Sequence, residues 1–141
     1  MAVSFHNADV TFTLRAKKVL KNFITSFFEK EKNKKITVSY IFCSDEYLLK
    51  INKDFLKHDY YTDIITFPLS ETPKRVDAEI YISLERVLEN AFKLKVPFDR
   101  ELHRVMFHGV LHLVGYKDKT KAEKLEMRES EDALLEMYDS K

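Results

Sequence analysis

The amino-acid sequence predicts an α+β fold, with a small mixed β-sheet of about four strands packed with about five helices in a single domain over residues 1–141. The chain can build one core, because 45% of its 141 residues are hydrophobic, and 11 Phe and 7 Tyr contribute to it. Segments that alternate polar and apolar residues are interspersed with segments of helical period. Their order, β-α-β-α-β-β-α-α-α, contains no repeat and no linker, which favours one α+β unit.

Two strands and two helices are predicted in the first part of the chain. Residues 3–5 alternate apolar and polar side chains as a short strand does, and residues 16–28 carry apolar side chains at the helical period. Residues 36–43 again alternate like a strand. Ser44, followed by two acidic residues, is a typical N-cap, and its helix is expected to run to about Leu56.

Two further strands are predicted in the middle of the chain. Residues 63–67 are rich in β-branched side chains, and we expect Pro68 to close this strand. A loop over residues 70–75 then leads into a strand over residues 78–83. Ser83, at the end of that strand, is expected to cap the helix that follows.

The last part of the chain is expected to be helical. Pro97 stops the preceding helix, and Asp99 is a good N-cap for a helix from Arg100 through Val114. Gly115 lies where a C′ glycine would end that helix. From Thr120 onward the sequence is charged and loosely amphipathic, so a final helix is predicted there.

Charge and cysteine content exclude several classes of protein. With 24 Lys and Arg against 23 Asp and Glu, the formal charge is +1, so any site for a polyanion has to be local, and no membrane partner is expected. The single cysteine, Cys43, excludes an internal disulfide framework; we expect no disulfide-linked partner and a reducing, cytoplasmic location. Residues 1–10 lack the features of a signal peptide, and no apolar stretch is long enough to cross a bilayer.

Two histidines and an aspartate follow a pattern typical of metal ligands. His108 and His112 are four residues apart in the predicted helix, so they lie on one face and can share a metal ion. Gly115 then ends the helix, which lets the carboxylate of Asp118 meet both imidazoles. Two imidazoles and one carboxylate with an open position favour a catalytic zinc site, with iron or manganese as alternatives. The other interpretation is a pair of core histidines beside a surface aspartate.

Gly109 distinguishes this pattern from that of the zinc proteases. In their HExxH motif the residue after the first histidine is a glutamate that acts as general base, and here that position is glycine. A glycine costs about 1 kcal/mol relative to alanine inside a helix, so we expect it to serve either close helix packing or space beside the metal. Of three functions that such a metal site could serve, a metalloprotease is therefore the least favoured. A metal enzyme of another kind and a binding module with a structural metal both rank above it.

The segment HGVLHLVGYKD, residues 108–118, resembles the signature HGxLHLxGYDH of the YbeY family of bacterial endoribonucleases. The seven identical positions, out of nine that the signature specifies, are His108, Gly109, Leu111, His112, Leu113, Gly115 and Tyr116. Upstream, TDIITFP at residues 62–68 is similar to the family's TDVLSFP segment, and AEIYIS at residues 78–83 is similar to its GDIxIS strand. The resemblance covers roughly residues 40–120, with the motifs in the family's order.

This resemblance implies a zinc-dependent endoribonuclease that prefers single-stranded RNA and acts in ribosomal RNA maturation and ribosome quality control. Its expected partners are ribosomal RNA and the ribosomal subunits, and its expected cofactor is one Zn²⁺ per chain, held by His108, His112 and Asp118. Asp118 stands at the place of the family's third histidine, with Lys117 in place of the preceding aspartate; a carboxylate is also a competent zinc ligand. Beyond these three metal ligands, no catalytic side chain is predicted. The alternative is a ribosome-associated binding module.

Two more departures from the family concern other positions. The family has an arginine shortly before its TDVLSFP segment, a candidate for contact with an RNA phosphate, and Leu56 stands at that place here. Lys53, Lys57 or His58 could make this phosphate contact instead. Glu79 replaces the aspartate of the GDIxIS strand, which keeps the charge on a longer side chain.

Basic and aromatic residues near the motif are candidate RNA contacts. The predicted contacts are Lys117, Lys119, Lys121 and Arg104, within a local basic cluster that also contains Arg100 and Lys124. Glu123 and Glu126 lie among these lysines, so a solvated helix face is the alternative. Of His58, Tyr60 and Tyr61, we expect at most one to stack on a base.

Overall fold

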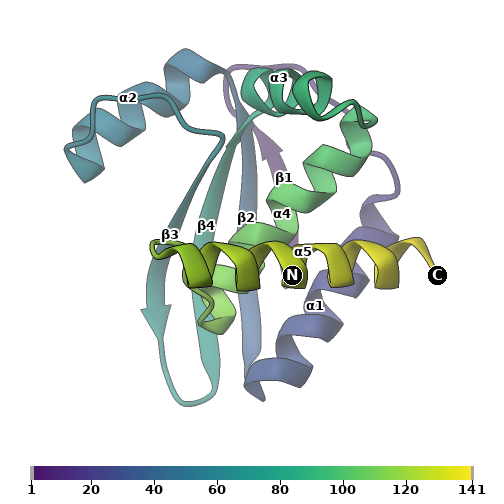
Figure 1. The fold of residues 1–141 in the computed structure, drawn as a ribbon. Coiled ribbons are helices and arrows are strands. Elements are labelled where there is room, and N and C mark those ends of the chain that lie inside the picture. The colour runs from purple at the N-terminus through teal and green to yellow at the C-terminus, as the bar shows by residue number, and fades with distance from the viewer. Residues whose placement is uncertain (1, 141) are drawn as a thin grey trace.

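The computed structural model describes residues 2–140, which form nine elements in the order that the sequence predicts (Figure 1). The strands are β1 (Val3–Asn7), β2 (Lys35–Cys43), β3 (Ile64–Glu71) and β4 (Arg75–Ser83). The helices are α1 (Lys17–Lys32), α2 (Asp45–Leu56), α3 (Leu84–Leu94), α4 (Phe98–Val114) and α5 (Lys121–Asp139). The predicted α+β fold is therefore confirmed over the described residues.

The four strands form one mixed sheet in the order β1-β2-β4-β3. β1 and β4 each run parallel to β2, while β3 is antiparallel to β4. α1 makes the crossover between β1 and β2, a connection that parallel strands require, whereas β3 and β4 need only the turn at residues 72–74. β3 lies at the edge of the sheet and has no strand partner on its outer side within residues 2–140.

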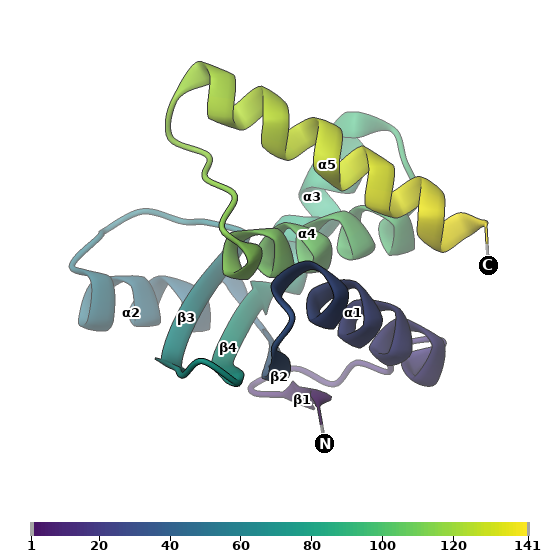
Figure 2. The ribbon, with the colours of Figure 1, turned by 90° about the horizontal axis from the view of Figure 1, so that it is seen from below.

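The helices cover the two faces of the sheet unequally. Figure 2 shows α1 and α4 side by side over one face, with α5 outside α4. The side chains of β2 and β4 that point to this face, such as Tyr40, Ile80 and Ile82, are fully buried. α2 packs on the opposite face near the β3 edge, where Leu48 and Ile65 belong to a smaller apolar cluster.

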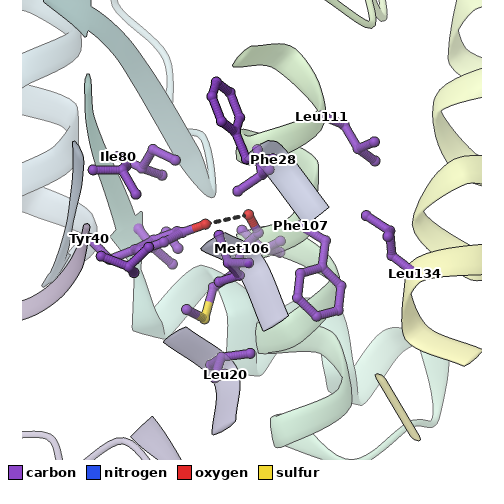
Figure 3. Packing of buried hydrophobic residues seen from close by; sticks show 14 of the residues in the cluster. Leu20, Phe28, Tyr40, Ile80, Met106, Phe107, Leu111 and Leu134 are labelled. Atoms are coloured by element: carbon purple, nitrogen blue, oxygen red, sulfur yellow. Dashed lines mark hydrogen bonds between the residues drawn. The ribbon is translucent and has the colours of Figure 1, made fainter. Parts of the chain in front are cut away.

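α4 is the central helix of the larger core, and its packing positions the candidate site. The carbonyl of Met106 accepts a hydrogen bond of 2.9 Å from the buried hydroxyl of Tyr40 (Figure 3). Three residues further on, Gly109 lies so close to β4 that a β-carbon there would be 2.9 Å from Cδ1 of Ile80. Of the two explanations for Gly109, the structure therefore supports close helix packing. Because Gly109 has no side chain, α4 can lie this close to the sheet immediately beside His108.

Several of the predicted boundaries are wrong. The fourth strand begins at Arg75 and not at residue 78, so the predicted loop over residues 70–75 is shorter, and the first strand continues to Asn7. Pro68 does not close the third strand, because β3 continues to Glu71. An edge strand tolerates a proline, and a shift of register between Pro68 and Ser70 accommodates it. Asp99 is not the N-cap of α4: Pro97 holds that place, and Asp99 lies in the first turn, where its charge still favours the helix dipole.

Several of the predicted helix ends are confirmed. The hydroxyls of Ser44 and Ser83 each accept a hydrogen bond from the backbone N–H three residues on. Gly115 ends α4 with φ of 122°, a conformation that glycine adopts more easily than other residues. Thr120 precedes α5 and caps it.

The single cysteine lies in the small apolar cluster under α2. Cys43 has no exposed surface, and burial raises the pKa of its thiol to about 12. A buried, protonated thiol reacts poorly in disulfide exchange. Among the described residues, no helix combines the length and the apolar character needed to cross a membrane.

Candidate metal centre

The chain from His108 to Asp118 brings three polar side chains to one point. His108 and His112 lie one turn apart on α4, and their Nε2 atoms are 3.0 Å apart. Gly115 ends the helix, and its N–H and that of Tyr116 donate back to the last turn, so the chain reverses. Oδ2 of Asp118 then lies 3.2 Å from each of the two Nε2 atoms. The three donor atoms proposed from the sequence therefore meet in one small space.

Hydrogen bonds of the other ring nitrogens fix which atoms face this space. Nδ1 of His112 lies 3.0 Å from the carbonyl of Tyr116, which can only accept, so this nitrogen carries the hydrogen. Nδ1 of His108 donates to Oε2 of Glu131 at 2.6 Å. Each neutral imidazole therefore presents the lone pair of Nε2 to the other ring and to Asp118. Three acceptors this close repel one another unless a cation lies among them.

A proton is the smallest cation that could relieve this repulsion. Burial acts to lower the pKa of His108, but the hydrogen bond to Glu131 and the charges of Glu131 and Asp118 outweigh burial and raise that pKa. In the absence of a metal, His108 therefore holds a proton more tightly than a free imidazole does. A metal ion that binds there has to displace this proton.

The spacing of the three donor atoms suits a small divalent ion. Zinc binds imidazole nitrogen and carboxylate oxygen at about 2.0–2.2 Å, which places neighbouring ligands of a tetrahedron about 3.3 Å apart. The observed separations of 3.0 Å and 3.2 Å lie close to that value. His108, His112 and Asp118 could therefore hold a metal ion and leave a fourth position open.

Glu131 of α5 supports this group from outside, and no sequence pattern indicates it. Its side chain is 6% exposed, and its Oε1 accepts a hydrogen bond of 3.2 Å from Arg104. A carboxylate that accepts from the far nitrogen of a metal-binding histidine fixes both the ring and its tautomer. Glu131 is 23 residues away from His108 in an acid-rich helix, so only the folded chain identifies it.

Arg104 lies on the inner side of α4, where its charge is already paired. Its guanidinium is 3.2 Å from Glu131 and 2.8 Å from Asp132, both on α5, and 3.6 Å from Glu101. Only 13% of the Arg104 side chain is exposed. This arrangement favours a structural role, joining α4 to α5, over the predicted contact with RNA.

A cavity of about 310 Å³ lies between α4 and α5, beside His108, and is lined by both acidic and basic side chains. Burial raises the pKa of both Asp63 and Glu101. Asn90 donates a hydrogen bond of 3.2 Å to Asp63, whereas Oε1 of Glu101 has no hydrogen-bond partner among the described residues. A carboxyl group whose pKa is raised is a candidate acid or base. Asp63 is the better placed of the two, because it also lines the open cleft on the other side.

That open cleft, of about 740 Å³, leads from solvent to His108, His112 and Asp118. The edge strand β3 and the loop before it line one side, and α4 with the loop after it lines the other. The lining residues include Leu56, His58, Tyr60, Asp63, His108, His112, Asp118 and Lys119. An extended substrate could therefore approach the three donor atoms from this side.

Of the three lysines predicted to contact RNA, one lines the cleft and two lie outside its lining. Lys119 lines the cleft. Lys117 and Lys121 are exposed, one in the loop after α4 and the other at the start of α5. All three lysines thus present positive charge on the chain that follows His112, although only Lys119 belongs to the lining.

Leu56, at the place of the family's arginine, lines the cleft at the end of α2. Of the three residues expected to replace that arginine, only His58 is also in the lining. Lys53 forms an ion pair with Asp59 at 3.5 Å. The ammonium of Lys57 donates to a backbone carbonyl of α2.

Two residues singled out from the sequence point away from the cleft. The hydroxyl of Tyr61 donates to Glu46 at 2.6 Å, and its ring lies beneath the guanidinium of Arg86, 5.1 Å from the ring centre. Glu79 alternates with core residues of β4 and lies on the opposite face of the sheet, where the hydroxyl of Tyr81 donates to it. Neither Tyr61 nor Glu79 belongs to the lining.

The chain is similar to known proteins over almost its whole length. It matches the family model described as Endoribonuclease YbeY over residues 2–139. A protein of Cytophaga hutchinsonii named Endoribonuclease YbeY is 47% identical over 135 residues, which cover 96% of this chain and 94% of the relative. A protein of the same name from Flavobacterium psychrophilum is 46% identical over 136 residues, covering 96% of each chain. The fold is similar to a solution structure from Thermotoga maritima, with a TM-score of 0.61, 26% identity, and coverage of 96% of this chain and 88% of that one.

Proposed function

The chain belongs to the Endoribonuclease YbeY family, and on this basis we propose that it is a metal-dependent endoribonuclease that hydrolyses phosphodiester bonds of RNA. Residues 1–141 would form one catalytic domain, with a preference for single-stranded RNA and a role in ribosomal RNA maturation. The observation that carries this proposal is the convergence of His108, His112 and Asp118 at the inner end of an open cleft.

Zinc is the proposed ion, with one Zn²⁺ per chain. Two imidazoles and one carboxylate suit zinc, and iron or manganese are the alternatives. A bound divalent ion supplies Lewis-acid chemistry for phosphodiester hydrolysis. The protein's contribution is to orient the two rings, through Glu131 for His108 and the carbonyl of Tyr116 for His112, so that both Nε2 lone pairs point to one place.

A binding module with a structural metal is the second candidate. One observation favours it: the hydrogen bond from His108 to Glu131 joins α4 to α5 directly beside the three proposed metal ligands. The open cleft and the free fourth position favour the enzyme. A metalloprotease is disfavoured, because Gly109, at the place of the HExxH glutamate, packs against Ile80 of the sheet.

Metal analysis coupled to RNA cleavage tests the proposed activity. Purified protein is expected to contain one zinc per chain and to cut an unstructured RNA faster than a structured one. A chelator should stop cleavage, and zinc should restore it. Metal-replete protein that cuts neither RNA, but unfolds when the metal is removed, would support the binding module instead.

Neutralising the exposed lysines that follow His112 is expected to weaken RNA binding. Each ammonium that pairs with a phosphate contributes about 0.7 to the dependence of log K on log salt for a single strand. Replacing Lys117, Lys119 and Lys121 together by glutamine should therefore flatten this slope by up to about 2. Binding measured from low to high salt gives the slope, and metal content should not change.

Three exposed lysines of α1 provide the matched control. Lys17, Lys18 and Lys30 carry the same charge, but α1 packs over β1 and β2, away from the β3 edge that lines the cleft. Replacing them by glutamine should leave the salt slope close to that of the wild-type protein. Equal slopes for the two triple variants would contradict a role for the lysines after His112.

The proposed partners are ribosomal RNA precursors and the ribosomal subunits that contain them, and the proposed location is the cytoplasm. Cells depleted of the protein should accumulate unprocessed ribosomal RNA, and a variant without the metal site should not correct this defect. Normal ribosomal RNA in depleted cells would contradict this substrate while leaving a general ribonuclease activity possible.

A further inference from the structure

Two aromatic side chains lie next to each other in the lining of the cleft, on the loop between α2 and β3. The rings of His58 and Tyr60 are stacked, with centroids 5.2 Å apart and planes at 20°. A hydrogen bond of 2.9 Å also joins the Tyr60 hydroxyl to Nδ1 of His58. Each ring thus contacts the other through one face, while Tyr60 as a whole is 55% exposed. The pair presents an aromatic surface in the same cleft as the proposed metal ligands.

We propose that His58 and Tyr60 form a subsite in which one nucleobase of the RNA stacks on the free face of the Tyr60 ring, while His58 supports that ring from its other face. This inference rests on the proposed function, because the base belongs to the RNA that is cut. Aromatic rings stack on any base, since every base has a π face. The base has to be unpaired and splayed out, because the neighbours in a duplex cover both of its faces. The subsite therefore gives a physical reason for a preference for single-stranded RNA.

A buried asparagine holds the loop that carries this pair. Asn52 of α2 is 1% exposed. Its carbonyl accepts a hydrogen bond of 3.0 Å from the N–H of His58, and its side-chain amide donates one of 2.8 Å to the carbonyl of Tyr60. A buried amide needs such partners, and this one fixes the backbone on both sides of Asp59. The two rings are held in place before the RNA binds, which lowers the entropy cost of binding.

The rest of the cleft can accommodate the sugar and phosphate that accompany a stacked base. Its volume of about 740 Å³ lies within the range of pockets that bind small ligands, about 300–1,000 Å³. Lys119 is exposed in the lining, so its ammonium can pair with a phosphate. Leu56 lines the cleft as well and adds apolar surface.

Binding of a short single-stranded oligoribonucleotide to the metal-loaded protein tests the subsite. The probe carries a fluorophore for anisotropy, and binding is read in the cold within a time too short for measurable cleavage, which a gel confirms. Tyr60→Ala is expected to weaken binding about 5- to 150-fold, because removal of a stacking ring has an effect of that size. Metal content should stay at the wild-type level.

Tyr61→Ala is the matched control for this variant. Tyr61 is the adjacent residue, has the same side chain and is 46% exposed, but its hydroxyl and ring are engaged by Glu46 and Arg86. It is expected to bind the probe with nearly wild-type affinity. If Tyr60→Ala binds as tightly as Tyr61→Ala, the proposed subsite is wrong.

Abasic probes identify the group that is bound. One position at a time in the oligoribonucleotide is replaced by an abasic unit, and the position at which the wild-type protein loses most affinity marks the stacked base. Tyr60→Ala should no longer distinguish the abasic probe from the intact probe at that position. If the full loss persists in Tyr60→Ala, the base binds elsewhere and the subsite is refuted. Wild-type, metal-loaded protein that cuts no RNA would instead refute the proposed function, before any variant is compared.

Discussion

Replacing His112 by alanine is expected to abolish stoichiometric metal binding and to lower RNA cleavage by about 1,000-fold or more. Only Nε2 of His108 and Oδ2 of Asp118 would remain, and two protein donors are fewer than zinc sites use. A metal ion contributes several kcal/mol to the transition state of such a reaction, and each step of about 1.4 kcal/mol changes the rate tenfold. Elemental analysis of the purified variant and initial rates on a labelled RNA measure the two effects.

Asp118→His is the matched control, because it changes a donor without removing it. Imidazole is at least as good a zinc ligand as carboxylate, and histidine is the residue that the family signature has at this place. This variant is expected to keep one metal per chain, whereas Asp118→Ala should lose affinity. Full metal content in His112→Ala would refute the site. Loss of metal in Asp118→His but not in Asp118→Ala would show that Asp118 is not a ligand.

Most of the fold was predictable because the signals that end a helix act over a few residues of chain. Ser44 and Ser83 cap helices through N–H groups three residues on, and Gly115 ends α4 through its own φ angle. Pro68 has no such local meaning. Whether a proline closes a strand depends on whether the strand lies at the edge of the sheet. β3 is an edge strand because it pairs with β4 and with no other strand of the described residues, and this pairing is a tertiary feature.

The same distinction separates the predictable part of the candidate site from the rest. The three proposed ligands lie within residues 108–118, on one helical turn and one reversal, so their spacing in sequence determines their spacing in space. Glu131 and Asn52 act through tertiary contacts. Glu131 of α5 bonds to His108 of α4, and Asn52 of α2 bonds to the backbone of the loop that carries Tyr60. Acids are frequent along α5, and nothing in the sequence distinguishes the one that meets His108.

Replacing Glu131 by alanine is expected to weaken metal binding about 10- to 100-fold, the usual effect of removing an outer carboxylate. Without this acceptor, Nδ1 of His108 loses its partner, so the ring can rotate and can adopt the other tautomer. Arg104 keeps Asp132 at 2.8 Å, so we expect the variant to fold. Competition with a coloured chelator measures the affinity, and the visible spectrum of the cobalt-substituted protein reports the ligand geometry.

Asp132→Ala isolates the bond between Glu131 and His108. Asp132 lies on the same helix and pairs with the same guanidinium of Arg104, but its carboxylate is 57% exposed and makes no hydrogen bond to His108. Both variants therefore remove one carboxylate from Arg104, and only Glu131→Ala also removes the partner of the ring. Wild-type metal affinity in Asp132→Ala, beside a weakened Glu131→Ala, would assign the loss to orientation of His108. Equal weakening of the two would assign it to the packing of α5 on α4, because that packing is what both variants disturb.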